Sequence, residues 1–124
     1  MRLTVDIVED DDAVRDSLRA LLEAYGFTVR EYPSATPYLD NNISTPSDCL
    51  VVDHHMPGMT GLELVETLRS RNVNIPTILL TGRDDPQLNN RMARAGIAKL
   101  LHKPIDDENL VRWIKETCSS SPAA

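Results

Sequence analysis

The segment Cys49–Asp53 restricts the fold more than any other part of the chain. Four apolar residues followed by an acid predict a strand that is buried on both faces, as strands of parallel sheets are. The loop behind it contains Pro57 and Gly58. Ligands of open α/β sheets bind beyond the carboxyl ends of the strands, so this pattern places Asp53 where it can bind or react. An isolated aspartate there more often only caps a turn, and the other strand ends must decide between these interpretations.

Strands and helices are predicted to alternate along the chain. The strands have short apolar or alternating patterns, and they cover residues 3–8, 27–32, 49–53, 77–81 and 97–101. The helices have apolar residues at three- and four-residue spacing, and they cover about 12–25, 34–41, 60–72, 85–95 and 106–118. This alternation predicts an α/β, flavodoxin-like (βα)5 domain, with a five-stranded parallel sheet of order 2-1-3-4-5 and helices on both faces. We expect one domain over residues 1–118, and a flexible tail or the start of a linker over 119–124.

Local signals predict where several helices begin. Asp11 or Asp12 is expected to cap the first long helix. Thr60 and Glu63 have the spacing of a capping box, in which each side chain binds the backbone of the other residue. Asp85, followed directly by a proline, should cap the fourth helix.

Composition narrows the function classes. The chain has 124 residues, of which 13 are Lys or Arg and 19 are Asp or Glu, so its formal net charge is −6. A domain this acidic is a poor candidate for direct nucleic-acid binding, which needs basic residues against the phosphates. The sequence has no signal peptide and no long apolar run, so we expect a cytoplasmic protein without a membrane span. Cys49 and Cys118 have no motif spacing and are expected to be reduced thiols, a disulfide being the less favoured interpretation.

Four of the predicted strands end on side chains that could act together. The first strand runs into Glu9 and Asp10, the third ends at Asp53, the fourth at Thr81, and Lys103 follows the fifth. Each residue alone has an ordinary explanation as a cap, a strand former or a solvated charge. In the predicted strand order they gather at one edge of the sheet, where three carboxylates would repel one another. A divalent cation would remove this repulsion.

Hard oxygen ligands favour Mg²⁺, with Mn²⁺ as the alternative. We expect Asp10, Asp53 and the backbone carbonyl of His55 to bind the ion directly. The longer side chain of Glu9 is better suited to hold a metal-bound water.

Asp53 would then keep one oxygen free to act as a nucleophile. Carboxylates form aspartyl-phosphates where the charge of the incoming phosphoryl group is offset. Mg²⁺ and Lys103 would offset that charge, and Thr81 would donate a hydrogen bond to a phosphoryl oxygen. The sequence therefore predicts a phospho-acceptor site at Asp53.

A transition-metal centre is an alternative, because all three histidines are expected near this edge: His54, His55 and His102. Hard carboxylates dominate the predicted pocket, and adjacent residues tend to point apart, which disfavours such a centre. A modest sensitivity to pH is the favoured consequence of these histidines.

Over about residues 3–118 the chain resembles a two-component response-regulator receiver domain. The resemblance is carried by Asp6–Asp11, by Val52–Asp53 with Met56–Gly61, by Ile78–Gly82 and by Lys103–Pro104. Thr81–Gly82 and Asn74–Pro76 are most similar to the FixJ-type branch. The resemblance implies a phospho-acceptor at Asp53, an acidic Mg²⁺ pocket, and a histidine kinase as the phosphate donor. It implies a phosphorylation-controlled signalling switch that relays its state to an output domain or partner, and not an enzyme.

The chain departs from the family pattern at a few positions. Leu100 stands where receivers usually carry a Tyr or Phe that rotates as a switch, so the usual aromatic readout is in doubt. His54 and His55 follow the acceptor, where apolar and then variable residues are usual. No output domain is present in the sequence.

The family resemblance also indicates where partners and solvent would act. His55 and Arg83 occupy positions that border the phosphoryl group, so they are expected to gate its hydrolysis. The fourth helix, fifth strand and fifth helix should form the surface that phosphorylation alters, and a phosphorylation-dependent homodimer is left open. Trp113 either faces a partner on this surface or packs in the core.

Two other functions remain as alternatives. A degenerate receiver would act by protein contact without phosphorylation, which the complete set of acids, Thr81 and Lys103 disfavours. A flavodoxin-like or Rossmann-like cofactor carrier would need a glycine-rich phosphate loop after the first strand. The acidic run 9–12 is electrostatically the opposite of such a loop.

Overall fold

The computed structural model describes residues 2–41, 47–83 and 85–119. Within these residues the five strands are β1 (Thr4–Val8), β2 (Thr28–Tyr32), β3 (Cys49–Asp53), β4 (Thr77–Thr81) and β5 (Lys99–His102). The five helices are α1 (Asp12–Ala24), α2 (Ala35–Asp40), α3 (Gly61–Ser70), α4 (Pro86–Ala95) and α5 (Asp107–Ser119).

The strands form one parallel sheet in the order β2-β1-β3-β4-β5, which confirms the predicted fold class. Val8 pairs with Val52, Asp53 with Leu80, and Thr81 with His102. The carboxyl ends of these neighbouring strands therefore lie at a common edge. The sheet brings the predicted site residues there from segments far apart in the chain.

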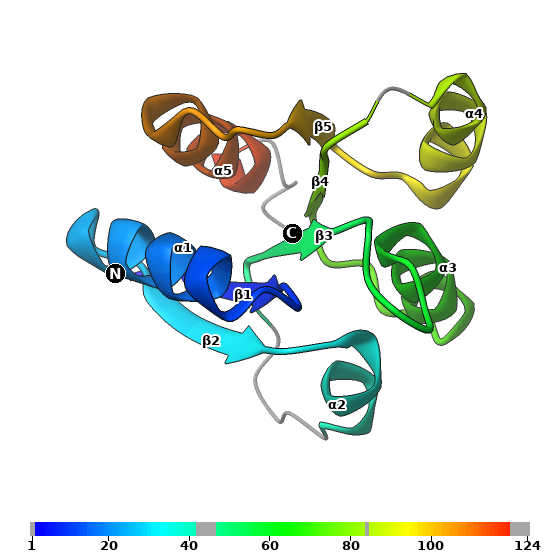
Figure 1. Ribbon diagram of the computed structural model, residues 1–124, viewed down its shortest axis with the longest axis horizontal. Helices are drawn as coiled ribbons and strands as arrows, with labels where there is room; N and C mark the ends of the chain where they lie inside the picture. Colours follow the sequence, from blue (N-terminus) through cyan, green and yellow to red (C-terminus); the bar gives the residue numbers. More distant parts are fainter. Residues whose placement is uncertain (1, 42–46, 84, 120–124) are drawn as a thin grey trace.

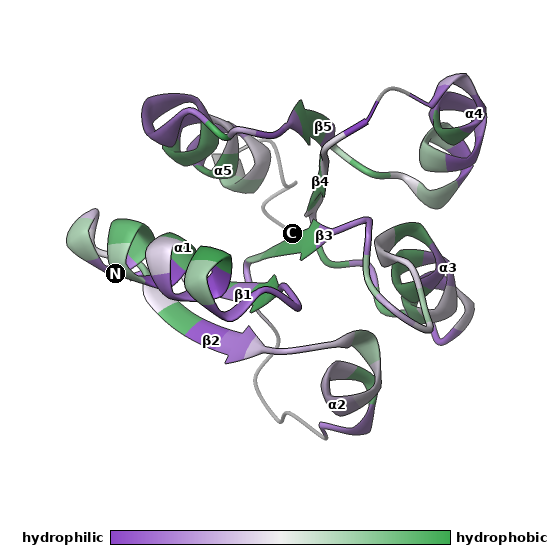
Figure 2. Cartoon of the chain, in the orientation of Figure 1, coloured by the Kyte–Doolittle hydropathy of each residue, from purple (hydrophilic) through white to green (hydrophobic). Residues whose placement is uncertain are grey.

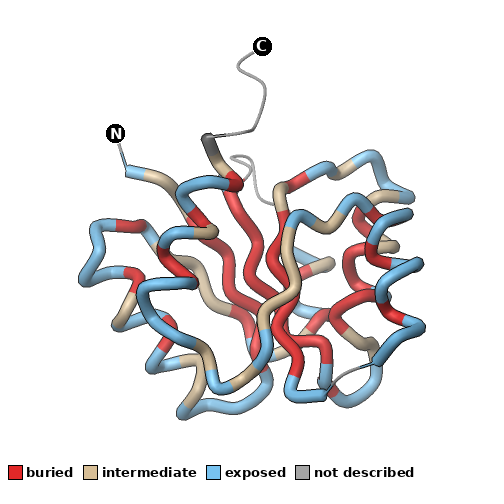
Figure 3. Tube along the Cα trace, turned by 90° about the horizontal axis from the view of Figure 1, so that it is seen from above, coloured by how far each residue is buried: buried red, intermediate tan, exposed pale blue. Residues whose placement is uncertain are grey.

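Helices cover both faces of the sheet. α1 and α5 lie on one side, and α2, α3 and α4 lie on the other (Figure 1). Successive residues of β3 go to opposite faces: Cys49 and Val51 belong to the core under α1 and α5, whereas Leu50 and Val52 belong to the core under the other helices. Hydrophobic positions lie along the strands and the inner faces of the helices (Figure 2), and buried residues concentrate in the strands (Figure 3).

The predicted caps are present. Asp11, rather than Asp12, caps α1 by accepting from the backbone N–H of Val14 at 3.0 Å. Thr60 and Glu63 form both hydrogen bonds of the capping box. Asp85 caps α4.

Several boundaries differ from the prediction by one or two residues, and two of them have a clear meaning. β5 begins at Lys99, because the N–H of Ile97 still bonds Met92 of the α4 terminus. α5 extends to Ser119, one residue into the predicted tail, and residues 120–124 lie outside the described part of the chain.

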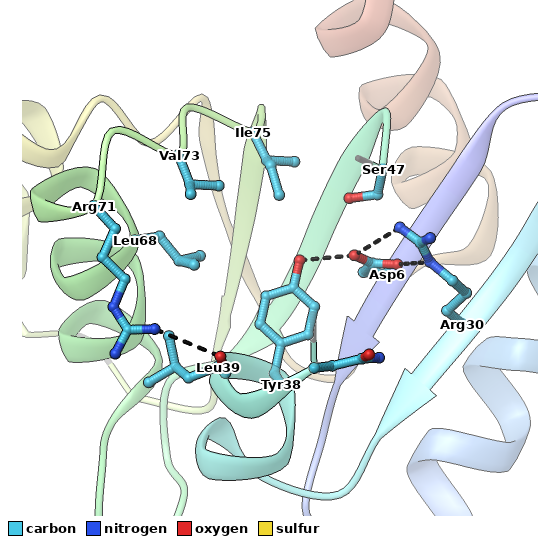
Figure 4. Close-up of a pocket in the computed structure, with 10 residues that line it drawn as sticks. Asp6, Arg30, Tyr38, Leu39, Ser47, Leu68, Arg71, Val73 and Ile75 are labelled. Carbon is cyan, nitrogen blue, oxygen red and sulfur yellow. Dashed lines mark hydrogen bonds and ion pairs between the residues drawn. The ribbon is translucent and has the colours of Figure 1, made fainter. Parts of the chain in front are cut away.

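A buried ion pair lies within the sheet, away from the carboxyl edge. Asp6, in the middle of β1, is fully buried and accepts from Arg30 Nε at 2.7 Å and from the Tyr38 hydroxyl at 2.7 Å (Figure 4). These bonds join β1, β2 and α2, so a polar group contributes to the packing of α2 against the sheet.

Replacing Asp6 by Ala is expected to lower the free energy of unfolding by about 2–3 kcal/mol. Arg30 and Tyr38 would each lose a bond to a buried carboxylate, and breaking one side of a buried pair is strongly destabilising. Urea unfolding measures the effect. Asp16→Ala, on the exposed side of α1, is the matched control and should change the value by less than about 0.5 kcal/mol. Equal midpoints for the two variants would contradict this role of Asp6.

Candidate functional site

Lys103 brings together the acids of β1 and β3. Its Nζ lies 3.0 Å from Oε1 of Glu9 and 3.2 Å from Oδ1 of Asp53. Both carboxylates are almost fully buried, at 1% and 2% exposure. The Lys103–Pro104 peptide bond is cis. Three of the predicted site residues therefore touch one another at the carboxyl edge of the sheet.

Burial and the neighbouring charges perturb this cluster. Burial, together with the nearby charge of Asp53, raises the pKa of Glu9 to about 7, although the hydrogen bond from Lys103 works against this shift. Burial acts to lower the pKa of Lys103, but its contacts with Glu9 and Asp53 outweigh burial and raise it. The site thus resists holding all of its negative charges unless a cation is near them.

Asp10 completes an acidic group with Glu9 and Asp53. One carboxylate oxygen from each lies within 4.8 Å of the others, and Asp10 is exposed to solvent. In the described residues this is the only group of three or more His, Cys, Asp or Glu side chains placed to hold a metal ion. Oδ1 of Asp53 is buried and accepts no hydrogen bond of good geometry, although its ion pair with Lys103 Nζ is 3.2 Å long. The donor set and this acceptor oxygen fit a hard divalent cation.

Two residues that were not predicted hold the backbone of the site. Arg15 donates to the Glu9 carbonyl at 2.8 Å, which fixes the turn between β1 and α1. Gly61 packs directly against the carbonyl of Asp53: a Cβ at this position would overlap that oxygen and lie 2.9 Å from Leu79 Cδ1. The Gly61 that follows the acceptor loop is visible in the sequence, but its close approach to Asp53 is not.

Thr81 is fully buried at the end of β4, and local partners occupy its hydroxyl. Oγ1 donates to the carbonyl of Arg83 at 3.0 Å and accepts from the Arg83 N–H at 3.2 Å. The ring Nε2 of His55 lies 3.0 Å from the same oxygen. With the hydroxyl hydrogen directed at Arg83, His55 donates to Thr81 from a protonated Nε2. The side chains of the acceptor loop and of β4 are thereby linked.

The other two histidines do not join a common metal site. His54 is buried and its Nδ1 faces the N–H of Leu62 at 3.4 Å, and burial lowers its pKa. His102 is exposed at the end of β5. The acidic group named above contains neither, so the hard-ligand interpretation remains the favoured one.

Leu100 and Trp113 are both half-buried. Leu100, half-buried in β5, packs against the core under α2, α3 and α4. Trp113, half-buried on α5, packs against the opposite core, with Lys99 Nζ 4.2 Å from its ring centroid. Trp113 therefore packs in part against the core, and a partner-facing role stays a prediction.

Without a divalent cation, the free energy of unfolding is expected to fall as the pH rises from about 4.5 to about 7. In that window folded Glu9 keeps its proton while unfolded Glu9 has lost it, so the folded state binds more protons. The loss should reach at most about 3 kcal/mol. Urea unfolding in EDTA, repeated across this pH range, measures the loss. The difference in unfolding free energy between wild type and Glu9→Gln isolates the contribution of Glu9, because the two proteins share the other titrating groups. Added Mg²⁺ should remove the difference, because it favours ionised carboxylates. Parallel pH profiles of the two proteins would refute this expectation.

Comparison with known proteins identifies the family. The response regulator receiver domain family matches residues 5–115. The chain belongs to this family. The receiver is 37% identical over 119 residues to the transcriptional regulatory protein FixJ of Azorhizobium caulinodans, covering 96% of the chain and 56% of that protein. It is 34% identical over 121 residues to FixJ of Rhizobium meliloti, covering 98% of the chain and 59% of that protein.

Solved structures of receiver domains show the same fold. A crystal structure of FixJ-N superposes with a TM-score of 0.88 at 32% identity, covering 100% of the receiver and 99% of that chain. Full-length FixJ from B. japonicum gives a TM-score of 0.89 at 31% identity, covering 99% of the receiver and 61% of that chain. The receiver thus spans less than two thirds of these longer regulators. None of the helices in its described ranges has the length and apolar character needed to cross a bilayer.

Proposed function

We propose that this receiver is a phosphorylation-controlled signalling switch of a two-component system, with Asp53 as the phospho-acceptor. The observation that carries the proposal is the contact of Lys103 with both Asp53 and Glu9 at the carboxyl edge of the sheet. Asp10 completes an acidic pocket around them. This arrangement supplies a nucleophile, a fixed positive charge and a cation site within one small volume.

An oxygen of Asp53 attacks the phosphorus atom of the donor, and the bond from phosphorus to the donor's leaving group breaks. Lys103 stays beside the acceptor carboxylate and stabilises the negative charge that the phosphoryl oxygens bring. Asp10, Asp53 and the carbonyl of His55 would hold Mg²⁺, or Mn²⁺, and Glu9 would hold a water of that ion. When bound, the cation neutralises charge on the phosphoryl oxygens and on the clustered carboxylates.

Thr81 is the residue through which the new charge would be sensed. Its hydroxyl is bonded to Arg83 and lies against His55. To donate to a phosphoryl oxygen, the hydroxyl must leave the Arg83 carbonyl, so the turn at 81–83 must rearrange. We infer that phosphorylation changes the surface of α4, β5 and α5 by this route. Because Leu100 replaces the usual aromatic switch, we expect a smaller change than in receivers that have one.

A histidine kinase is the proposed donor, and a groove beside the site offers it a docking surface. The groove runs between α1 and the segment that joins β5 to α5, and its lining is mostly apolar: Ala13, Val14, Leu18, Leu21, Pro104 and Ile105. Lys103 lies at its end. An amphipathic helix that carries the phosphohistidine could cover these side chains and reach Asp53.

The receiver acts as the phospho-acceptor, assisting its own phosphorylation and dephosphorylation, and is not proposed to turn over a separate substrate. Its output would be an attached domain or a partner protein that reads α4, β5 and α5. The FixJ relatives are named as transcriptional regulatory proteins and are longer than this chain. We propose the same kind of output here, in a part of the protein other than the receiver.

The experiment that tests this function is incubation with acetyl phosphate, followed by intact mass spectrometry. One phosphoryl group should be added in the presence of Mg²⁺, and none in EDTA. Labelling that is independent of the cation would remove the acidic pocket from the mechanism. The absence of labelling under every condition would instead favour a degenerate receiver that acts by protein contact alone.

The lifetime of the phosphoryl group is expected to shorten several-fold in Arg83→Ala, and further when His55→Ala is added. Hydrolysis needs a water in line with the P–O bond, and we expect these side chains to limit its approach. Arg83 could also form a charge-assisted bond to a phosphoryl oxygen. Decay is followed after the phosphodonor is removed. A double variant that decays no faster than wild type would refute gating, and slower decay in His55→Ala would make His55 a base.

A further inference from the structure

The two cysteines of the chain meet at the edge of the sheet opposite to the phospho-acceptor site. Cys49 is the first residue of β3 and is fully buried. Cys118 lies in the last turn of α5 and is half-buried. Both belong to the core under α1 and α5. The carboxyl end of α5 lies at the amino end of β3, because Sγ of Cys118 contacts the residue that precedes this strand.

The two cysteines are close neighbours in the packed core. Sγ of Cys118 lies 3.6 Å from the carbonyl oxygen of Asp48, in the peptide unit that leads into Cys49. The neighbouring Cys118 thiol, together with burial, raises the pKa of Cys49, whereas the neighbouring Cys49 thiol lowers the pKa of Cys118. The more acidic thiol is therefore also the more accessible one.

Buried cysteines are commonly inert packing groups. Two features separate this pair from that ordinary case. The second thiol lies against the peptide unit that leads into the first, across a separation of 69 residues in sequence (118 minus 49). In addition, Cys118 reaches solvent and has the character of a reactive thiol, for which thiolate formation and access are the requirements.

We propose that Cys49 and Cys118 form a thiol–disulfide site, which closes when the receiver meets a peroxide. The Cys118 thiolate attacks one peroxide oxygen, the O–O bond breaks, and the other oxygen leaves as water, so that Cys118 becomes a sulfenic acid. The Cys49 sulfur then attacks the Cys118 sulfur, the S–O bond breaks, and a second water leaves. Two thiols lose two electrons and two protons, and one peroxide is reduced to two waters.

The closed disulfide would tie the last turn of α5 to the start of β3. Asp53 lies at the other end of the same strand, so phosphoryl acceptance should continue in the oxidised protein. What changes is the freedom of the α5 terminus. The disulfide would therefore restrict the motion of α5. Its chemistry is separate from that of the proposed phospho-acceptor Asp53.

The test treats the folded receiver with hydrogen peroxide, alkylates the remaining thiols, and measures intact mass and tryptic peptides. Wild type should lose two hydrogen atoms, resist alkylation, stay monomeric on a non-reducing gel, and recover both thiols with dithiothreitol. Cys49→Ala should instead accumulate a sulfenic acid at Cys118 that dimedone traps. Cys118→Ala should keep Cys49 reduced, because burial shields that thiol from peroxide, so Cys49 is alkylated in full once the treated protein is unfolded.

Several results would overturn the proposal. These are two thiols that remain alkylatable in oxidised wild type, a disulfide only between two chains, or a Cys118 that proceeds to sulfinic acid without pairing. Melting curves add a second measurement: the oxidised protein should melt several degrees higher, and dithiothreitol should reverse the shift. A lower melting temperature would mean that the native fold does not accommodate the bond. Acetyl phosphate labelling that vanishes on oxidation would contradict the separation of the two sites.

Discussion

Asp53→Asn is expected to accept no phosphoryl group from acetyl phosphate. The amide keeps the shape of the carboxylate but lacks its charge and nucleophilic oxygen. In wild type, Asp53 Oδ1 lies 3.2 Å from Lys103 Nζ and is buried, so the carboxylate is already placed beside the charge that assists it. Intact mass after incubation with Mg²⁺ should show labelling below detection.

Asp48→Asn is the matched control for this variant. Asp48 lies at the amino end of the same strand, where its side chain accepts from the N–H of Thr4. An asparagine can keep that bond, so labelling should equal that of wild type. If Asp53→Asn is labelled as well as wild type, Asp53 is not the acceptor.

Gly61→Ala is expected to lower both stability and phosphoryl acceptance. The added methyl would overlap the Asp53 carbonyl oxygen and press on Leu79, so the backbone that holds the acceptor must move. Overpacking of this kind costs about 1–3 kcal/mol. Misplacing a reacting group by about 1 Å can cost roughly 100-fold in rate, so we expect the labelling rate to fall at least about tenfold.

Gly82→Ala provides the control for the stability effect. A Cβ at Gly82 meets no heavy atom within 4 Å, and its backbone is not in the left-handed region. Its urea midpoint should stay near that of wild type, while that of Gly61→Ala falls. Similar midpoints for the two variants would show that the chain relaxes around Gly61 without cost.

The fold could be predicted because its signals are local. The apolar run of β3, the capping box of Thr60 and Glu63, and the Asp85 cap each depend on residues within a few positions of one another. The start of β5 was predicted two residues too early. Residues 97 and 98 continue an apolar pattern, but one of them bonds back to the end of α4.

The contacts that hold α2 on the sheet and the acceptor loop in place could not be predicted, because they join segments that are distant in the sequence. Asp6 meets Arg30 and Tyr38 across 24 and 32 residues, and only the folded sheet brings them together. The same is true of the approach of Gly61 to the Asp53 carbonyl. The gathering of Glu9, Asp53 and Lys103 could be predicted, because parallel strands end at one edge. The chemical roles of these residues stay predictions until labelling is measured.

The division of the core into two packed layers has a consequence for signalling. The groove beside Lys103 is lined by α1 and the β5–α5 segment, whereas the Leu100 side chain packs on the layer of α2, α3 and α4. The sheet lies between the two layers, and the phospho-acceptor site lies at its carboxyl edge. The proposed kinase groove and the Leu100 side chain thus lie on opposite faces of one small domain, and α5 of the proposed output surface belongs to the face of the groove. A substitution in α1 can then change kinase recognition while the packing around Leu100 stays intact.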